Sequence, residues 1–169
     1  MTTSLLTDAD QVVHTAWQHY AEASDDQRQI AALEEVSAHV STNRVFRVVF
    51  GDQSSLVAKV SSYGSYFLFA EDHDRLARCA ALLRHTRWAG FLADVLSIDK
   101  RPYTWYDGRC WCAFYGEVQR AESLPRILPP ADVAGLAHEI ARFHHACGEI
   151  APALPAVSNS VKGDAIHLF

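Results

Sequence analysis

The sequence of 169 residues predicts an α+β fold, in which an antiparallel sheet of about five strands is flanked by helices. Three observations support this prediction. Two runs of β-branched and aromatic residues flank a short turn near residue 50, and three more strand-like runs lie between residues 93 and 115. Apolar residues at helical spacing mark several of the other segments. We therefore expect a sheet that buries its apolar side chains against helices.

The N-terminal part predicts two helices. Residues 4–23 place Val13, Ala16, Trp17 and Tyr20 on one helical face. Ser24-Asp25-Asp26-Gln27 matches a capping box, which predicts a second helix that presents Ile30 and Leu33. Residues 36–40 continue that helix or begin a strand.

A β-hairpin follows, with strands near 44–50 and 55–61 and the turn Gly51-Asp52-Gln53 between them. Residues 65–69 form a short strand or part of a loop. From Glu71 to His85 the apolar stripe predicts a helix.

The C-terminal half predicts strands at 93–98, 103–106 and 110–115, the last two joined by the hairpin signal Asp107-Gly108. Leu128-Pro129-Pro130 opens a long helix. The sequence ends Ile166-His167-Leu168-Phe169, an apolar tail that we expect of a chain cut from a longer protein.

Composition narrows the classes of function. A formal net charge of −5 and the lack of a Lys/Arg run argue against broad nucleic-acid binding. The sequence shows neither an apolar stretch of membrane-spanning length nor a signal peptide, so we expect a cytoplasmic protein without a membrane partner. The four cysteines are then expected to be reduced. Their spacing differs from that of a structural zinc site, and no metal site is predicted.

Lys59 is the most informative residue. It is one of three lysines among 15 Lys and Arg residues, and it interrupts the apolar run Leu56–Val60. A buried ammonium requires a partner. In the alternative interpretation, Lys59 lies on the solvent face of an edge strand, because Val57, Lys59 and Ser61 share one face.

Four segments resemble the N-terminal lobe of the aminoglycoside phosphotransferase and choline kinase-like family, which has a protein kinase-like fold. They are Asn43–Val48, Val57–Val60, Phe114–Val118 and Leu136–His144. The first resembles the strand after the nucleotide loop, and the second resembles the strand that carries the phosphate-binding lysine. The third is placed like the hinge between lobes, and the fourth is similar to the helix that follows.

The resemblance implies ATP as ligand, with Mg²⁺ held by residues of a second, helical lobe. Lys59 would hold the α- and β-phosphates, and Glu71 would pair with Lys59, with Asp72 and Asp74 as competitors. The other implied nucleotide contacts are Ser41, Thr42 and Asn43 in the loop, and Tyr115, Gly116, Glu117 and Val118 at the hinge.

Two departures limit this implication. The loop His39-Val40-Ser41-Thr42 contains no glycine, so its backbone approaches phosphates less easily. The family's aspartate base and metal-binding residues have no counterpart, because Gly163–His167 lacks the trailing asparagine. No catalytic or metal-binding residue is therefore predicted in this chain.

The sequence thus divides into leading helices (1–40), a sheet and helix of the lobe (41–118), an interlobe linker and helix (119–150) and the start of a second lobe or a tail (151–169). We expect the ATP-binding lobe of a small-molecule phosphotransferase, inactive without the second lobe. The alternative is a nucleotide-sensing or regulatory module without catalysis. The acceptor and the oligomeric state remain open at this point.

Overall fold

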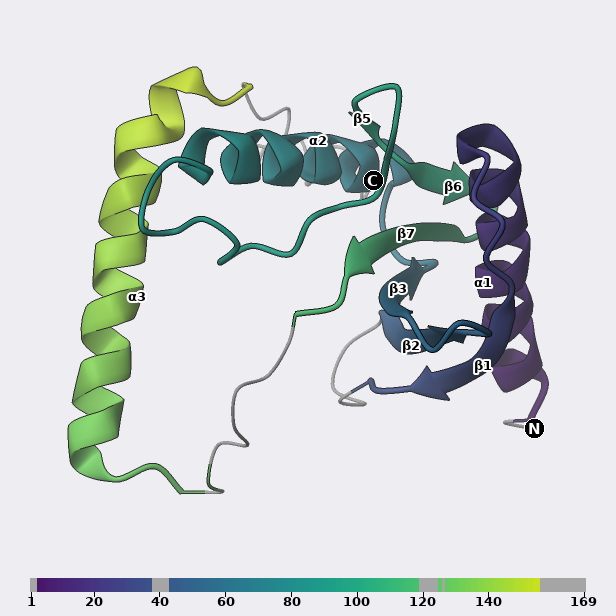
Figure 1. The fold of residues 1–169 in the computed structure, drawn as a ribbon, viewed down its shortest axis with the longest axis horizontal. Coiled ribbons are helices and arrows are strands. Elements are labelled where there is room, and N and C mark those ends of the chain that lie inside the picture. Colours follow the sequence, from purple (N-terminus) through teal and green to yellow (C-terminus); the bar gives the residue numbers. More distant parts are fainter. Residues whose placement is uncertain (1–2, 38–42, 119–124, 126, 156–169) are drawn as a thin grey trace, which may run out of the picture.

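The computed structural model describes residues 3–37, 43–118, 125 and 127–155, and within these ranges it confirms an α+β fold with a five-stranded antiparallel sheet (Figure 1). The elements are α1 (Thr3–Ser24), β1 (Ile30–Glu35), β2 (Arg44–Phe50), β3 (Ser55–Ser61), α2 (Tyr66–Leu83), β4 (Ser97–Ile98), β5 (Arg101–Pro102), β6 (Thr104–Tyr106), β7 (Trp111–Gly116), α3 (Pro130–Ile150) and a 3₁₀ turn (Ala151–Ala153).

The main sheet has the strand order β1-β2-β3-β7-β6, and β4 pairs with β5 in a separate ribbon. In the main sheet, Lys59 lies opposite Val45 on β2 and opposite Ala113 on β7. Strand β3 is therefore an interior strand with a neighbour on each side. The interpretation of Lys59 as a residue of an edge strand is wrong.

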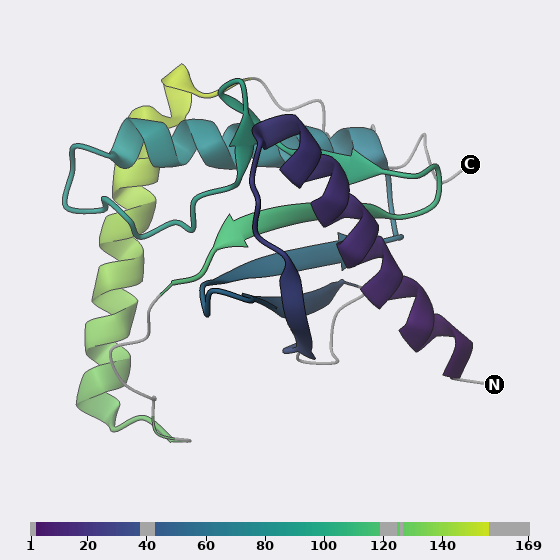
Figure 2. The same ribbon diagram turned by 45° about the vertical axis from the view of Figure 1, so that its right-hand side comes forward.

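Helix α1 covers one face of the sheet and crosses the strands obliquely (Figure 2). Its predicted apolar face is confirmed, since Val13 and Ala16 are fully buried and Trp17 is nearly so. These side chains pack with Phe46, Val48, Phe50, Ala58 and Phe114 of the sheet. The indole N–H of Trp17 also donates to the Arg28 carbonyl at 3.0 Å, which ties α1 to the chain leading into β1.

The predicted second helix is wrong, because residues 30–35 form strand β1. Asp25 adopts a φ of 56° directly after α1, and this left-handed conformation ends the helix. The Asp26 carboxylate then accepts hydrogen bonds from both the backbone N–H and the guanidinium of Arg28, so it stabilises a turn where a capping box is predicted. Ile30 and Leu33 pair with Phe50 and Val48 of β2. The sheet thus begins before residue 41.

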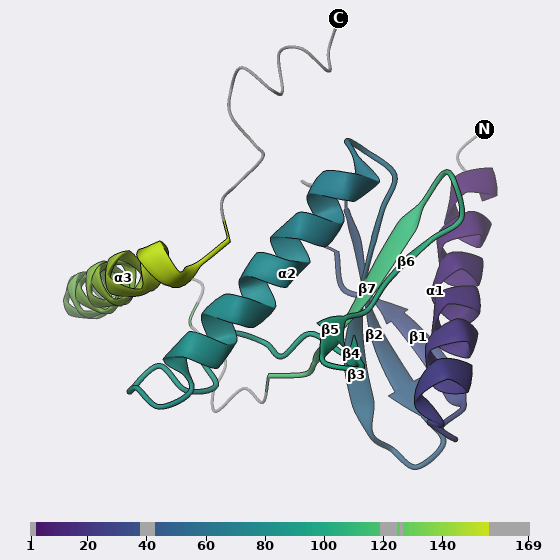
Figure 3. The same cartoon turned by 90° about the horizontal axis from the view of Figure 1, so that it is seen from above.

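Helix α2 begins at Tyr66, five residues before the predicted start, so residues 66–69 belong to a helix and are neither a strand nor a loop. Of the three later strand predictions, the run 110–115 corresponds to β7, and the run 103–106 corresponds to β6. The run 93–98 forms only the short strand β4 and a bridge from Val95 to Tyr115. Seen from above, α2 lies on the side of the sheet opposite α1 (Figure 3).

Helix α3 confirms the predicted long helix and lies outermost, beyond α2 (Figure 3). Phe143 packs against Trp88 and Phe91, with ring centroids 5.3 and 4.6 Å apart, and Glu139 pairs with Arg87 at 2.8 Å. All residues of α3 are described, and none of them is buried. Among the described helices, none is both long enough and apolar enough to cross a membrane.

Candidate functional site

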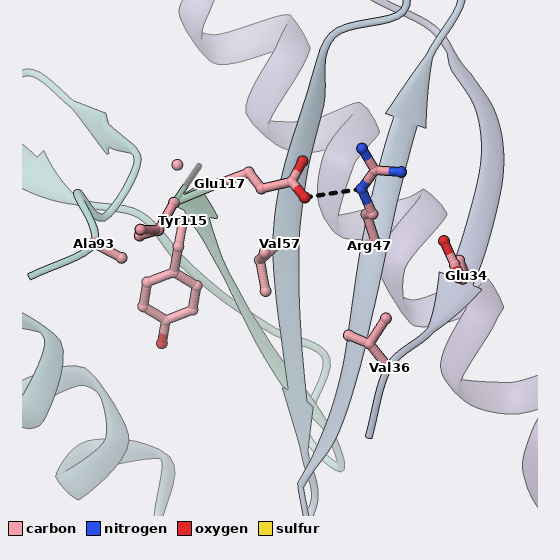
Figure 4. Close-up of a pocket in the computed structure, with 9 residues that line it drawn as sticks. Glu34, Val36, Arg47, Val57, Ala93, Tyr115 and Glu117 are labelled. Carbon is pink, nitrogen blue, oxygen red and sulfur yellow. Dashed lines mark hydrogen bonds and ion pairs between the residues drawn. The ribbon is translucent and has the colours of Figure 1, made fainter. Parts of the chain in front are cut away.

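The sheet face opposite α1 carries an open groove of about 710 Å³ at the end of β7 (Figure 4). Val57 lies on its floor, between Arg47 of β2 and Tyr115 of β7. The predicted hinge residues Tyr115, Gly116, Glu117 and Val118 all line this groove. The remaining lining residues are Glu34, Val36 and Ala93. The groove therefore combines an apolar floor with charged side chains from both sides.

An ion pair crosses the groove above Val57. The Arg47 Nε lies 2.9 Å from the Glu117 Oε1 (Figure 4). The Ser55 hydroxyl donates to the other carboxylate oxygen. The hydrogen bond to Glu117 raises the pKa of the Arg47 guanidinium above its ordinary value. Both side chains remain partly exposed, at 42% for Arg47 and 26% for Glu117. A ligand that rests on Val57 therefore contacts this pair or displaces it.

Two backbone groups near the end of β7 already have hydrogen-bond partners. The Gly116 N–H donates to the Asp94 carbonyl at 2.8 Å, and the Leu96 N–H donates to the Phe114 carbonyl at 2.9 Å. The bond to Asp94 occupies one of the backbone groups for which the sequence predicts a contact with adenine. Glu117 and Val118, which follow the end of β7, line the groove beyond this bond.

The Lys59 side chain leaves the same face of β3 as Val57, two residues further along the strand. Two residues of a strand span about 7 Å, so the ammonium group lies beyond the groove, on the side of α2. Its Nζ lies 5.5 Å from the ring centroid of Phe69, a cation–π contact. Lys59 is partly buried there.

Glu71, the predicted partner of Lys59, lies in the second turn of α2. At 100° per residue, Glu71 is about 200° around the helix from Phe69, whose ring contacts Lys59. The α2 side chains that are buried beneath the sheet at this end are Phe69 and His73. The Lys59–Glu71 ion pair stays a prediction.

His73 is a site residue that the sequence interpretation missed. It is only 4% exposed, and it lies close to Phe69, Tyr115 and Lys59. The Phe69 carbonyl can only accept, so the Nδ1 of His73 carries the proton and donates at 2.5 Å. The Nε2 then accepts from the Tyr115 hydroxyl. The spacing of Phe69 and His73, four residues apart on one helical face, is the sequence signal that would have found this pair.

Burial controls the ionisation of this cluster. It lowers the pKa of His73 below its ordinary value, and the nearby Lys59 charge acts in the same direction. Burial also raises the pKa of Tyr115. The His73–Tyr115 pair is therefore neutral near pH 7, and it joins α2 to β7.

The predicted phosphate loop is described only in part. Ser41 and Thr42 lie outside the described residues. Asn43 directly precedes β2, whose first residue, Arg44, pairs with Val60. The start of β2 is therefore at the same end of the sheet as Lys59.

No group of three or more His, Cys, Asp or Glu residues within the described ranges has the arrangement to hold a metal ion.

We compared the chain with models of protein families, with curated proteins and with solved structures, and none of the three comparisons gives a match.

Proposed function

We propose that this chain is the ATP-binding lobe of a small-molecule phosphotransferase similar to the aminoglycoside phosphotransferase and choline kinase-like family. One observation carries the proposal: Lys59 lies on an interior strand, next to a groove that all four predicted hinge residues line. A lysine on the third strand, followed by a helix, is the arrangement with which kinase-like folds hold the phosphates of ATP.

The geometry supports a definite orientation of the nucleotide. The base would lie on Val57, against the hinge residues Glu117 and Val118. The phosphates would extend along β3 toward Lys59, which is about 7 Å further along the strand. The start of β2 lies at that same end of the sheet, since Val45 pairs with Lys59.

The reaction would be transfer of the γ-phosphoryl group to a hydroxyl of a small acceptor. In such transfers the protein mainly positions the groups and stabilises charge. Lys59 would neutralise phosphate charge, and the hinge would orient the base. The acceptor site, the base and the Mg²⁺ ligands belong to a second lobe by the resemblance, so this chain by itself is expected to bind ATP and not to transfer phosphate.

A second candidate is a nucleotide-sensing or regulatory module without catalysis. One observation favours it: the loop before Asn43 lacks glycine. The two candidates differ in the protein that contains a second lobe. Loss of Lys59 would abolish turnover in a phosphotransferase, whereas it would leave partner binding by a regulatory module largely intact.

Thermal unfolding with and without Mg-ATP tests nucleotide binding. At a ligand concentration a hundred times its Kd, binding stabilises the folded state by about 2.7 kcal/mol. Lys59→Met removes the charge and keeps the aliphatic stem on Phe69, so this variant should fold and lose the stabilisation. The control is Lys100→Asn, since Lys100 is exposed and has a φ of 67°, which asparagine tolerates. The proposal is wrong if folded wild-type protein gains no stability, or if Lys59→Met gains as much as wild type.

A further inference from the structure

Helix α2 holds one wall of the groove through a buried histidine. Tyr115 lines the groove next to Val57, its partner in the pairing of β3 with β7. The Tyr115 hydroxyl donates to the Nε2 of His73, and the two ring centroids lie 5.6 Å apart. In Figure 4 the Tyr115 ring points away from the Glu117 carboxylate. The position of this wall is therefore set by an α2 side chain that does not itself line the groove.

The imidazole of His73 is held on more than one side. Its Nδ1 donates to the Phe69 carbonyl at 2.5 Å, so the backbone of α2 fixes one edge of the ring. The Phe69 ring packs against the imidazole with centroids 4.1 Å apart, and it lies 6.1 Å from the Trp111 ring of β7. The Tyr115 hydroxyl is thus bonded to an acceptor that has little freedom to move.

The same face of α2 also supports Lys59. Phe69 and His73 lie about one helical turn apart, and the Lys59 Nζ lies 5.5 Å from the centroid of the Phe69 ring. Lys59 pairs with Ala113 of β7, two residues before Tyr115. One turn of α2 therefore contacts both Lys59, the proposed phosphate ligand, and Tyr115, which lies beside the proposed place of the base.

A purely structural His73–Tyr115 hydrogen bond would stabilise the fold and leave ligand binding unchanged. The groove gives this bond a second consequence, because the ring that it anchors is a wall of the groove. Without the anchor, the Tyr115 side chain is free to turn between rotamers, and the width of the groove above Val57 is no longer fixed. A ligand that needs this wall must then bear the cost of ordering it.

We propose that His73 is a positioning residue of the nucleotide site, which holds the Tyr115 ring in place as the wall against which the base lies. This inference rests on the proposed function. His73 would contact no atom of the nucleotide and would act through Tyr115. Loss of the hydrogen bond should raise the Kd of Mg-ATP about three- to tenfold, the range that one such bond commonly contributes.

Isothermal titration calorimetry of the full chain with Mg-ATP measures this effect. His73→Leu removes the acceptor, and Tyr115→Phe removes the donor while the ring remains, so each should raise the Kd. The double variant should bind no more weakly than the weaker single variant, because both substitutions break the same hydrogen bond. His73→Gln keeps an amide oxygen near the place of Nε2, so this variant should restore most of the wild-type affinity.

Tyr103→Phe is the matched control for Tyr115→Phe. The Tyr103 hydroxyl donates to the Ala16 carbonyl of α1 at 2.9 Å, so its loss should lower the stability of the fold and leave the Kd unchanged. The inference alone is overturned if wild-type protein binds Mg-ATP and Tyr115→Phe binds it equally tightly, or if the effects of the two single substitutions add. If wild-type protein does not bind Mg-ATP, the proposed function and this inference both fail. Tyr115→Phe decides the question even if His73→Leu does not fold.

Discussion

At the scale of single residues, the cluster of Lys59, Phe69, His73 and Tyr115 is the most unusual feature of the chain. It places a cation, an aromatic face and a buried imidazole between the sheet and α2. Both ring nitrogens of His73 are hydrogen-bonded, so the neutral tautomer is the form that fits the fold. A proton added to Nε2 would remove the acceptor for the Tyr115 hydroxyl.

This cluster predicts a pH-dependent stability. Burial lowers the pKa of His73 below its ordinary value of 6.5, so the folded state binds fewer protons than the unfolded chain. The stability contribution is therefore complete above pH of about 6.5, and it is lost as the pH falls from there through the lowered pKa. Lys59 strengthens this effect, while Asp72 and Asp74 oppose it. Urea unfolding at a series of pH values below about 6.5 measures this loss of stability.

The matched variants for this prediction are His73→Gln and His14→Gln. The first removes the buried titrating group, so its unfolding midpoint should depend less on pH than that of wild type. His14 is exposed on α1, and its replacement should leave the wild-type dependence. If His73→Gln keeps the full loss of stability below pH of about 6.5, other groups are responsible.

At the scale of elements, α1 supplies much of the core, and Trp17 is its central contact. The indole is 4% exposed and lies 4.6 Å from the Phe50 ring and 5.4 Å from the Phe114 ring. Trp17→Ala should lower the free energy of unfolding by about 3–5 kcal/mol, because it removes an aromatic side chain from a packed interior. Gln18→Ala on the exposed face of the same helix should change it by less than about 0.5 kcal/mol. Urea unfolding of both variants compares the two faces directly.

Strand β1 is the element for which the local sequence pattern gave a wrong prediction, a helix in place of a strand. The two large apolar residues of this strand, Ile30 and Leu33, lie three positions apart, a spacing that fits a helix face as well as an irregular edge strand. The register shift between Ile30 and Ala32 in the pairing with β2 produces that spacing in a strand. Because only one neighbour pairs with β1, nothing in its own sequence requires strict alternation.

At the scale of the whole molecule, α3 is a long helix that buries none of its residues, all of which are described. Val133, Leu136 and Ile140 are 45–50% exposed along one face of α3. Replacing these three residues by glutamine should change the free energy of unfolding by less than about 0.5 kcal/mol each and reduce the binding of the apolar dye ANS. The contrasting control is Leu83→Gln on α2, where the side chain is 1% exposed and the loss of stability should be large. A strong destabilisation by the α3 substitutions would show that this face is packed in solution.

Sequence patterns alone were enough to predict the strands of the central hairpin, the apolar face of α1, the long helix α3 and the position of Lys59 within an apolar run. Each of these depends on a local pattern. Apolar residues repeat every two positions in a strand and every 3.6 positions in a helix, and turn residues separate two β-branched segments. The four residues 115–118, which only the family resemblance selected, all line the groove.

The strand order and the contacts between distant residues could not be predicted from any local pattern. Strand order placed β3 in the interior and brought Val57 beside Tyr115, a pairing between residues 58 positions apart. The same folding directed His73 toward Tyr115 and joined Arg47 to Glu117 across the groove. These contacts depend on which strands become neighbours and how a helix is rotated on a sheet, and the free energy that selects them is spread over the whole core, not contained in any one segment.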